Sequence, residues 1–212
     1  QLVELHRDRG DVQYAVGDIY VGRVRKVMPS LNAGFVDVGH GKDAFLHHSD
    51  LGPQFKTQQI WVKRVMSGKQ PTSEISQFKR EEDIDRKGKM KDYVSASQLV
   101  MVQVAKEPIS TKGPRLTAEV SLPGRYIVLV PFSDKVSLSS RIKGEKERNR
   151  LKRLMQSIQP PGFGIIVRTV AENKGSADLH SDLEDLVSRW KKLYENLKKA
   201  KETLKKTKEN QL

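Results

Sequence analysis

The feature that most constrains the fold is a pattern of alternating residues between positions 18 and 46. Over positions 19–27 two sets of residues alternate, which is the period of a strand with one buried face. One side carries Ile19, Val21, Arg23 and Arg25, and the other carries Tyr20, Val24 and Lys26. A turn at 29–32 and a tight connection at 39–42 separate two further strand-like runs. The pattern therefore predicts a three-stranded meander.

Two phenylalanines lie in consecutive strands of this meander. Phe35 and Phe45 are surrounded by Gly, Ala and Lys, so at least one ring can face outward, where a nucleic-acid base could stack on it. The alternative is that both are core residues, as most strand phenylalanines are. Residues 111–116 (TKGPRL) are expected to fold back onto the meander. In this segment Lys112 is either a ligand contact beside a permissive glycine or a solvated loop lysine.

The charge of the chain indicates a polyanionic partner. Its 212 residues carry a formal net charge of +13, and lysine and arginine release condensed counterions when they bind phosphates. No apolar run approaches the roughly 20 residues of a spanning helix, and no signal-peptide core opens the sequence, so nucleic acid is favoured over a membrane. The lack of cysteine excludes disulfides and thiolate zinc sites and fits a cytoplasmic protein.

Between the meander and the next strand the periodicity weakens. Residues 52–91 combine Gly-Pro, Gln-rich and mixed-charge stretches, so we expect a long loop there. Phe55, Ile60 and Trp61 form either a small satellite cluster or a stacking site within it.

The remaining chain predicts both strands and helices. Residues 92–106 are typical of a central strand with apolar side chains on both faces, and 116–120 of a further strand. Residues 122–170 alternate strands with a helix at 144–158, which indicates a small α+β unit. Residues 176–212 predict a long amphipathic helix with a basic end. Its apolar seam packs on the rest of the chain or serves a coiled-coil dimer.

Three strings of the sequence resemble the ribonuclease E/G family of bacterial endoribonucleases. They are GRVRKVMPSLNAGFVDVGHGKDAFLH, VMVQVAKEPISTKGPRLTAEVSLPGRYIVLVP and GIIVRT. The resemblance implies an α+β chain: a five-stranded OB-fold (S1-type) barrel over 18–121, a 5′-sensor α+β subdomain over 122–175 and the C-terminal helix over 176–212. It further implies that 1–17 form a hairpin of a ribonuclease-H-like subdomain. Because the sequence opens at Gln1 in mid-pattern, we expect it to be part of a longer chain.

The resemblance also implies roles for particular residues. In the family the barrel contacts single-stranded RNA, and that role falls on Phe35, Phe45 and Lys112. The sensor recognises a monophosphate at the 5′ end of RNA, for which an arginine fork and a threonine hydroxyl are suitable donors. Without the resemblance, an Arg-Thr pair would indicate only a surface salt bridge. The residues that match the sensor pocket are Gly124, Val128, Arg141, Arg168 and Thr169.

Family members cleave RNA with Mg²⁺ held by paired aspartates and dimerise partly through Zn²⁺ held by cysteines, both beyond the sensor. We therefore expect no catalytic residue, metal or cofactor in this chain, no cleavage by it alone, and any homo-oligomer mainly through the missing part. Its barrel aspartates are expected to be turn formers, and its histidines lack partners at metal spacing. The predicted function is RNA binding and 5′-monophosphate recognition within an endoribonuclease of RNA processing and decay. The alternative is a stand-alone S1-type RNA-binding or ribosome-associated protein.

Overall fold

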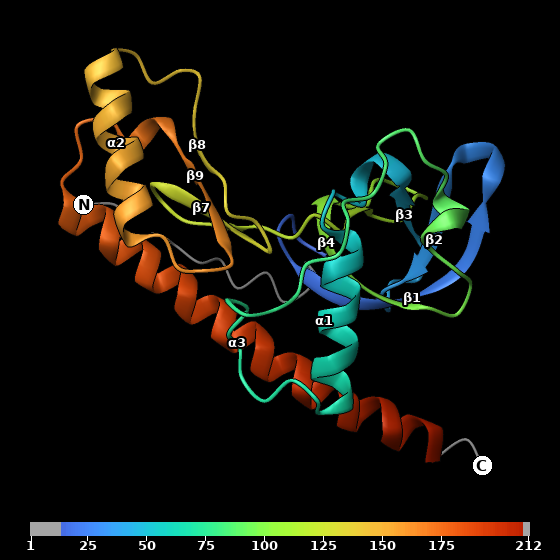
Figure 1. Ribbon diagram of the computed structural model, residues 1–212. Coiled ribbons are helices and arrows are strands. Elements are labelled where there is room, and N and C mark those ends of the chain that lie inside the picture. The colour runs from blue at the N-terminus through green and yellow to red at the C-terminus, as the bar shows by residue number, and fades with distance from the viewer. Residues whose placement is uncertain (1–13, 210–212) are drawn as a thin grey trace.

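The computed structural model describes residues 14–209 and shows two lobes that share one long helix (Figure 1). The hairpin expected at 1–17 falls almost entirely outside these residues. Its last four positions, 14–17, form a turn that leads into the first strand.

The first lobe is the closed five-stranded barrel that the sequence predicts, and the OB-fold is confirmed. Its strands are β1 (Ile19–Met28), β2 (Ala33–Asp37), β3 (Ala44–His47), β4 (Leu99–Lys106) and β5 (Arg115–Thr117). They follow one another around the barrel in the order β1-β2-β3-β5-β4, with β3 and β5 parallel. The last strand is shorter than expected and begins one residue earlier.

The alternation in β1 produces two different faces. Val24 is buried in the barrel core, whereas Ile19 and Val21 point outward and pack against the second lobe. A β-bulge lies between Val24 and Lys26, and bulges re-aim the side chains that follow them. Lys26 therefore lies on the outer face opposite Phe35, not on the same side as Val24 as simple alternation predicts.

The strand expected at 92–106 begins only at Leu99, but the prediction that it is apolar on both faces is confirmed. Val100, Val102 and Val104 point into the barrel core. Between them, Met101 is fully buried on the opposite face, in the core of the second lobe. This single strand thus belongs to two hydrophobic cores.

The expectation of a continuous loop at 52–91 is wrong. The segment contains α1 (Phe55–Ser67), which ends at Gly68 in the left-handed conformation (φ 76°), and a short 3-10 turn at Met90–Asp92. Nor do the three apolar residues of the segment form one cluster. Phe55 packs in the barrel core, Trp61 lies in the core of the second lobe, and Ile60 is exposed.

The second lobe is a four-stranded sheet covered on one face by helices. The sheet consists of β6 (Leu122–Pro123), β7 (Ile127–Pro131), β8 (Val136–Leu138) and β9 (Phe163–Val167), in the order β6-β7-β9-β8. Helix α2 (Glu145–Ile158) packs on this sheet through Leu151 and Met155. The sequence predicts this unit apart from the two-residue β6.

Helix α3 (Ser176–Glu209) runs along both lobes, and α1 crosses it (Figure 1). From Leu179 to Leu197 its seam is buried against this chain, so the coiled-coil alternative is wrong for this part of the helix. Trp190 of α3 stacks on Trp61 of α1, with ring centroids 4.7 Å apart and planes at 27°. The buried seam residues are Leu179, Leu183, Leu186, Trp190, Tyr194 and Leu197. None of the helices within residues 14–209 is long and apolar enough to cross a lipid bilayer.

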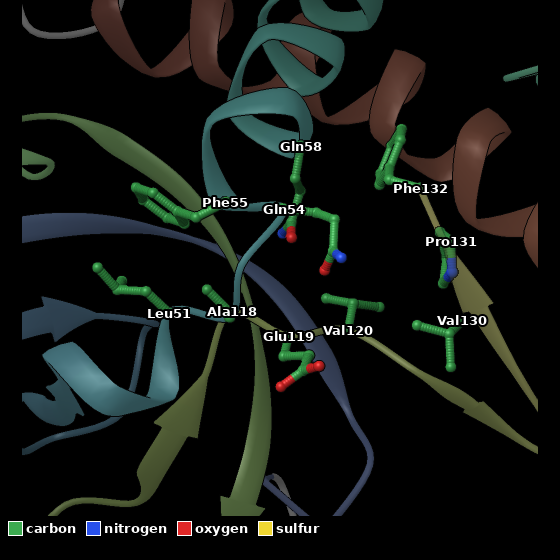
Figure 2. Close-up of a pocket in the computed structure, with 11 residues that line it drawn as sticks. Leu51, Gln54, Phe55, Gln58, Ala118, Glu119, Val120, Val130, Pro131 and Phe132 are labelled. Atoms are coloured by element: carbon green, nitrogen blue, oxygen red, sulfur yellow. The ribbon is translucent and has the colours of Figure 1, made fainter. Parts of the chain in front are cut away.

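The lobes meet closely where α1 begins. Figure 2 shows the junction, where Leu51 and Phe55 lie on the barrel side and Pro131 and Phe132 on the sheet side. The cavity between them is about 10 Å³, room for no more than a water molecule. Above it the Gln58 amide donates a hydrogen bond to the carbonyl of Met101 (3.0 Å). The junction is therefore packed core and not a ligand site.

Candidate nucleic-acid interface

The outer face of the barrel carries a pair of aromatic rings. Phe35 of β2 and Phe45 of β3 are directly opposite in the strand register, and their ring centroids are 5.7 Å apart in an edge-to-face arrangement. Both side chains are half-buried, and neither belongs to the barrel core. The sequence allows each ring to lie in the core or on the outer face. The structure places both rings on the outer face, where a planar ligand can reach them.

Three further side chains surround this pair, and sequence reasoning missed them. The Lys26 ammonium lies 5.1 Å from the centre of the Phe35 ring, a cation–π distance. The His47 ring stacks on Phe45 at 6.4 Å, and Arg115 lies opposite Phe45 in the strand register. The i, i+2 spacing of Phe45 and His47 was the available signal, because such residues share one face of a strand.

The segment that contains Lys112 folds back onto the meander as expected. The Phe45 amide donates to the carbonyl of Pro114 (2.9 Å), and β5 continues beside β3. A Cβ atom at Gly113 would collide with the main-chain oxygen of Asp43, so only glycine permits this approach. Lys112 itself is exposed, in a tight turn beside the aromatic strand.

A second group of predicted residues meets at one end of the sheet. Strand β9 is antiparallel to β7 and parallel to β8. The start of β7 therefore lies at the same end of the sheet as the ends of β8 and β9. This places Gly124 next to Arg168, whose Nη1 donates to the Gly124 carbonyl (2.6 Å) and more weakly to that of Arg125 (3.4 Å). The guanidinium is exposed, and among residues 14–209 its other N–H groups have no hydrogen-bond partner, so they can meet a ligand.

The other side of this group is organised by a serine. Ser139 Oγ lies 3.0 Å from the Thr169 hydroxyl and accepts a hydrogen bond from the Arg141 amide (3.3 Å). From α2, Arg148 donates to the carbonyls of Ser139 (2.9 Å) and Ile142 (3.1 Å). Thr169 and Arg141 are thus linked through Ser139, a residue that no sequence pattern indicated.

Val128 lies apart from the polar groups. It is paired with Ile166 across β7 and β9, on the face of the sheet opposite that of the buried Ile127 and Val167. Ile166 is 42% exposed, so this face is open to solvent. The structure therefore places Gly124, Arg168 and Thr169 at one end of the sheet, with the Arg141 main chain linked to Thr169 through Ser139 and Val128 on an adjacent apolar surface.

An ion pair fixes the loop that follows Thr169. Arg150 forms two hydrogen bonds of 2.7 Å with the Glu147 carboxylate, which also accepts from the Asn173 amide (2.9 Å). The Arg150 guanidinium lowers the pKa of Glu147 from 4.5 to about 2. The stabilising effect of the ion pair is therefore complete above the unfolded pKa of 4.5 and is lost as the pH falls through about 2.

Glu147→Gln is accordingly expected to destabilise the chain by about 1 kcal/mol at pH 7, a difference that shrinks by roughly half or more at pH 3. Urea unfolding at both pH values measures it. Glu145→Gln, at an exposed position of the same helix, is the matched control. A pH-independent difference would show that the ion pair is not formed.

The described histidines lie in different surroundings, and none of them belongs to a metal-binding cluster of described residues. Within residues 14–209 no three His, Asp or Glu side chains are arranged to hold a metal ion. His47 lies on the outer face, whereas His48 is buried beside Tyr93, where desolvation lowers its pKa.

Taken together, these features define an OB-fold protein with an aromatic, basic outer face and an attached α+β lobe. Residues 121–212 match the sequence profile of the Ribonuclease E/G family. Ribonuclease E of Synechocystis sp. (strain ATCC 27184 / PCC 6803 / Kazusa) is 40% identical over 90% of this chain and 24% of its own length. Ribonuclease G of Escherichia coli (strain K12) is 38% identical over 91% of this chain and 35% of its own length.

The chain therefore belongs to the ribonuclease E/G family. It spans about a quarter to a third of the length of these relatives.

Proposed function

We propose that this chain binds single-stranded RNA on the barrel and recognises a monophosphate at the RNA 5′ end with the second lobe. The observation that carries the proposal is the outward Phe35–Phe45 pair beside Lys26, in a chain of net charge +13. Aromatic faces stack on bases of any sequence, and nearby cations follow the phosphate backbone. The names of the two relatives, both ribonucleases, support RNA as the ligand.

The second lobe provides the chemistry for a terminal phosphate. A 5′ monophosphate carries between one and two charges and several terminal oxygens near pH 7, whereas an internal phosphodiester carries a single charge. The free N–H groups of Arg168 form charge-assisted hydrogen bonds with such a group, and the Thr169 hydroxyl adds another donor. The open surface at Val128 and Ile166 lies beside them, where the first nucleotide can rest.

In this proposal the chain selects the substrate of a longer, cytoplasmic endoribonuclease that acts in RNA processing and decay. Hydrolysis with Mg²⁺, and association through Zn²⁺, belong to the part of the relatives that this chain does not span. The chain's role is to hold the RNA body on the barrel and its 5′ end on the sheet.

Arg168→Ala is expected to remove the preference for a 5′ end. The unchanged chain should bind a short 5′-monophosphorylated RNA more tightly than its 5′-hydroxyl twin, and no worse than the triphosphate. In the variant the affinity ratio of the first two RNAs should fall to about one, because the charge-assisted donors are lost. Fluorescence anisotropy at low salt measures the three affinities.

The control is Arg153→Ala, which removes the same charge from an exposed position of α2. It should lower the affinity for all three RNAs equally and leave the affinity ratio of monophosphate to hydroxyl ends unchanged. Equal affinity of the unchanged chain for monophosphate and hydroxyl ends would contradict the proposal.

A further inference from the structure

A carboxylate from α3 holds the turn between β6 and β7. Asp182 Oδ1 accepts a hydrogen bond from the Arg125 amide (2.9 Å), and its Oδ2 accepts from the amides of Tyr126 (2.7 Å) and Ile127 (3.0 Å). Successive backbone N–H groups that converge in this way form an anion-binding concavity. Here the anion is part of the protein.

The glycine of the turn makes this contact possible. A Cβ atom at Gly124 would lie 2.6 Å from Asp182 Oδ2 and 2.7 Å from Oδ1, too close for any side chain. Gly124 therefore has a structural role toward α3. This role is separate from any contact with a ligand.

The same turn presents its carbonyl groups to Arg168. The oxygens of Gly124 and Arg125 accept hydrogen bonds from Arg168 Nη1, and the Arg168 amide donates to the carbonyl of Tyr126 (2.8 Å). The turn is thus polarised, with N–H groups directed at Asp182 and oxygens directed at Arg168. Among the described residues no hydrogen bond or ion pair joins Asp182 to Arg168 directly.

We infer that Asp182 is a positioning residue for the terminal-phosphate site. Its carboxylate fixes the turn, and the fixed turn orients the Arg168 guanidinium so that the remaining N–H groups face the ligand. Without the carboxylate, three amides lose their acceptor, and a turn that begins with glycine has many other conformations available. A loosely held guanidinium must be ordered when the phosphate binds, which weakens binding. The inference deepens the proposed function and rests on it.

Asp182→Asn tests the inference, because asparagine keeps the shape and one acceptor oxygen while its amide group faces a backbone N–H. The affinity ratio of 5′-monophosphorylated to 5′-hydroxyl RNA should fall about tenfold, the scale of a lost supporting contact at a functional site. Affinity for the 5′-hydroxyl RNA should stay within about twofold, because the barrel is untouched. Asp185→Asn, the same charge change at an exposed position of α3, should leave both values unaltered.

Side-chain NMR of Arg168 in the RNA-free chain separates positioning from general destabilisation. A guanidinium held by two carbonyls rotates slowly and shows distinct N–H signals, which should average in Asp182→Asn and persist in Asp185→Asn. Thermal melting of each variant confirms that the lobe is folded at the temperature of measurement.

The two readouts distinguish failure of this inference from failure of the proposed function. Unchanged Arg168 signals in a folded Asp182→Asn chain would overturn the positioning role, whatever the RNA affinities. If the unchanged chain does not distinguish RNA ends, the proposed function is overturned, together with the ligand assigned to this site. The spectra would then still decide whether Asp182 controls Arg168.

Discussion

Trp190→Ala is expected to lower the free energy of unfolding by about 3–5 kcal/mol, the usual cost of removing a buried tryptophan. Trp190 is 2% exposed, and its ring lies between those of Trp61 (4.7 Å), Phe163 (5.5 Å) and Phe132 (6.0 Å). Its indole N–H donates to the carbonyl of Ser73 (2.8 Å), which alanine cannot replace. Urea unfolding followed by circular dichroism measures the change.

Two companion variants define the cause. Trp190→Phe keeps most of the ring contacts and should cost less than the alanine change, chiefly through the lost hydrogen bond. Lys191→Ala, at the exposed neighbouring position, should stay within about 0.5 kcal/mol of the unchanged chain. A loss below about 1 kcal/mol in Trp190→Ala would mean that α3 does not pack on α1 in solution.

Phe45→Ala is expected to weaken binding of single-stranded RNA by about 1–3 kcal/mol, the value of one stacked base. Because the ring is half-buried on the outer face, stability should fall by only about 1 kcal/mol, the scale of a cross-strand pair. Anisotropy with an unstructured RNA gives the affinity, and melting of the same samples gives the stability.

Phe45→Leu is the matched control, because leucine keeps an apolar side chain but removes the flat aromatic face. It should melt like the unchanged chain and still bind RNA poorly. Lys112→Ala, by contrast, should lower the slope of log affinity against log salt by about one, with little dependence on sequence. A Phe45→Ala chain that is strongly destabilised but binds RNA normally while folded would show that the ring is a core residue and not an RNA contact.

The residue pattern predicted the three-stranded meander, and the family resemblance implied that it closes into a barrel. Alternation with period two is visible wherever one face is buried, and it located β1, β2 and β3 without reference to any relative. Side-chain direction after the bulge in β1 was not predictable. One extra residue between Val24 and Lys26 reverses the alternation, and nothing in the local composition marks it.

Helix α1 was missed although its spacing was present. Phe55, Gln58, Trp61 and Val65 lie three or four residues apart on one face, but a glutamine occupies one of these positions. That glutamine is 4% exposed because its amide reaches the Met101 carbonyl on β4, a contact made only in the folded chain. A polar residue in an apolar stripe thus concealed the helix.

The residues around Arg168 show a different limit of prediction from the sequence. Arg168 and Thr169 were selected by resemblance. Their neighbours come from other elements: Ser139 meets the Thr169 hydroxyl, Arg148 donates to the Ser139 carbonyl, and Asp182 accepts from the amides of the β6–β7 turn. Asp182 does carry a faint signal, because it lies three residues after Leu179 and four before Leu186 on the buried side of α3. An acid at such a position needs donors, but only the structure shows that they come from the β6–β7 turn.

The contact between Trp61 and Trp190 also gives the molecule an internal optical signal. These are the only two tryptophans in the sequence, and each belongs to a different part of the chain that α1 and α3 bring together. Indole rings stacked at 4.7 Å couple their electronic transitions, so the pair should produce a paired band of opposite signs in the circular dichroism spectrum. The band depends on the distance between the rings and vanishes when they separate. Any ligand that moves α1 away from α3 would therefore be detected without a label.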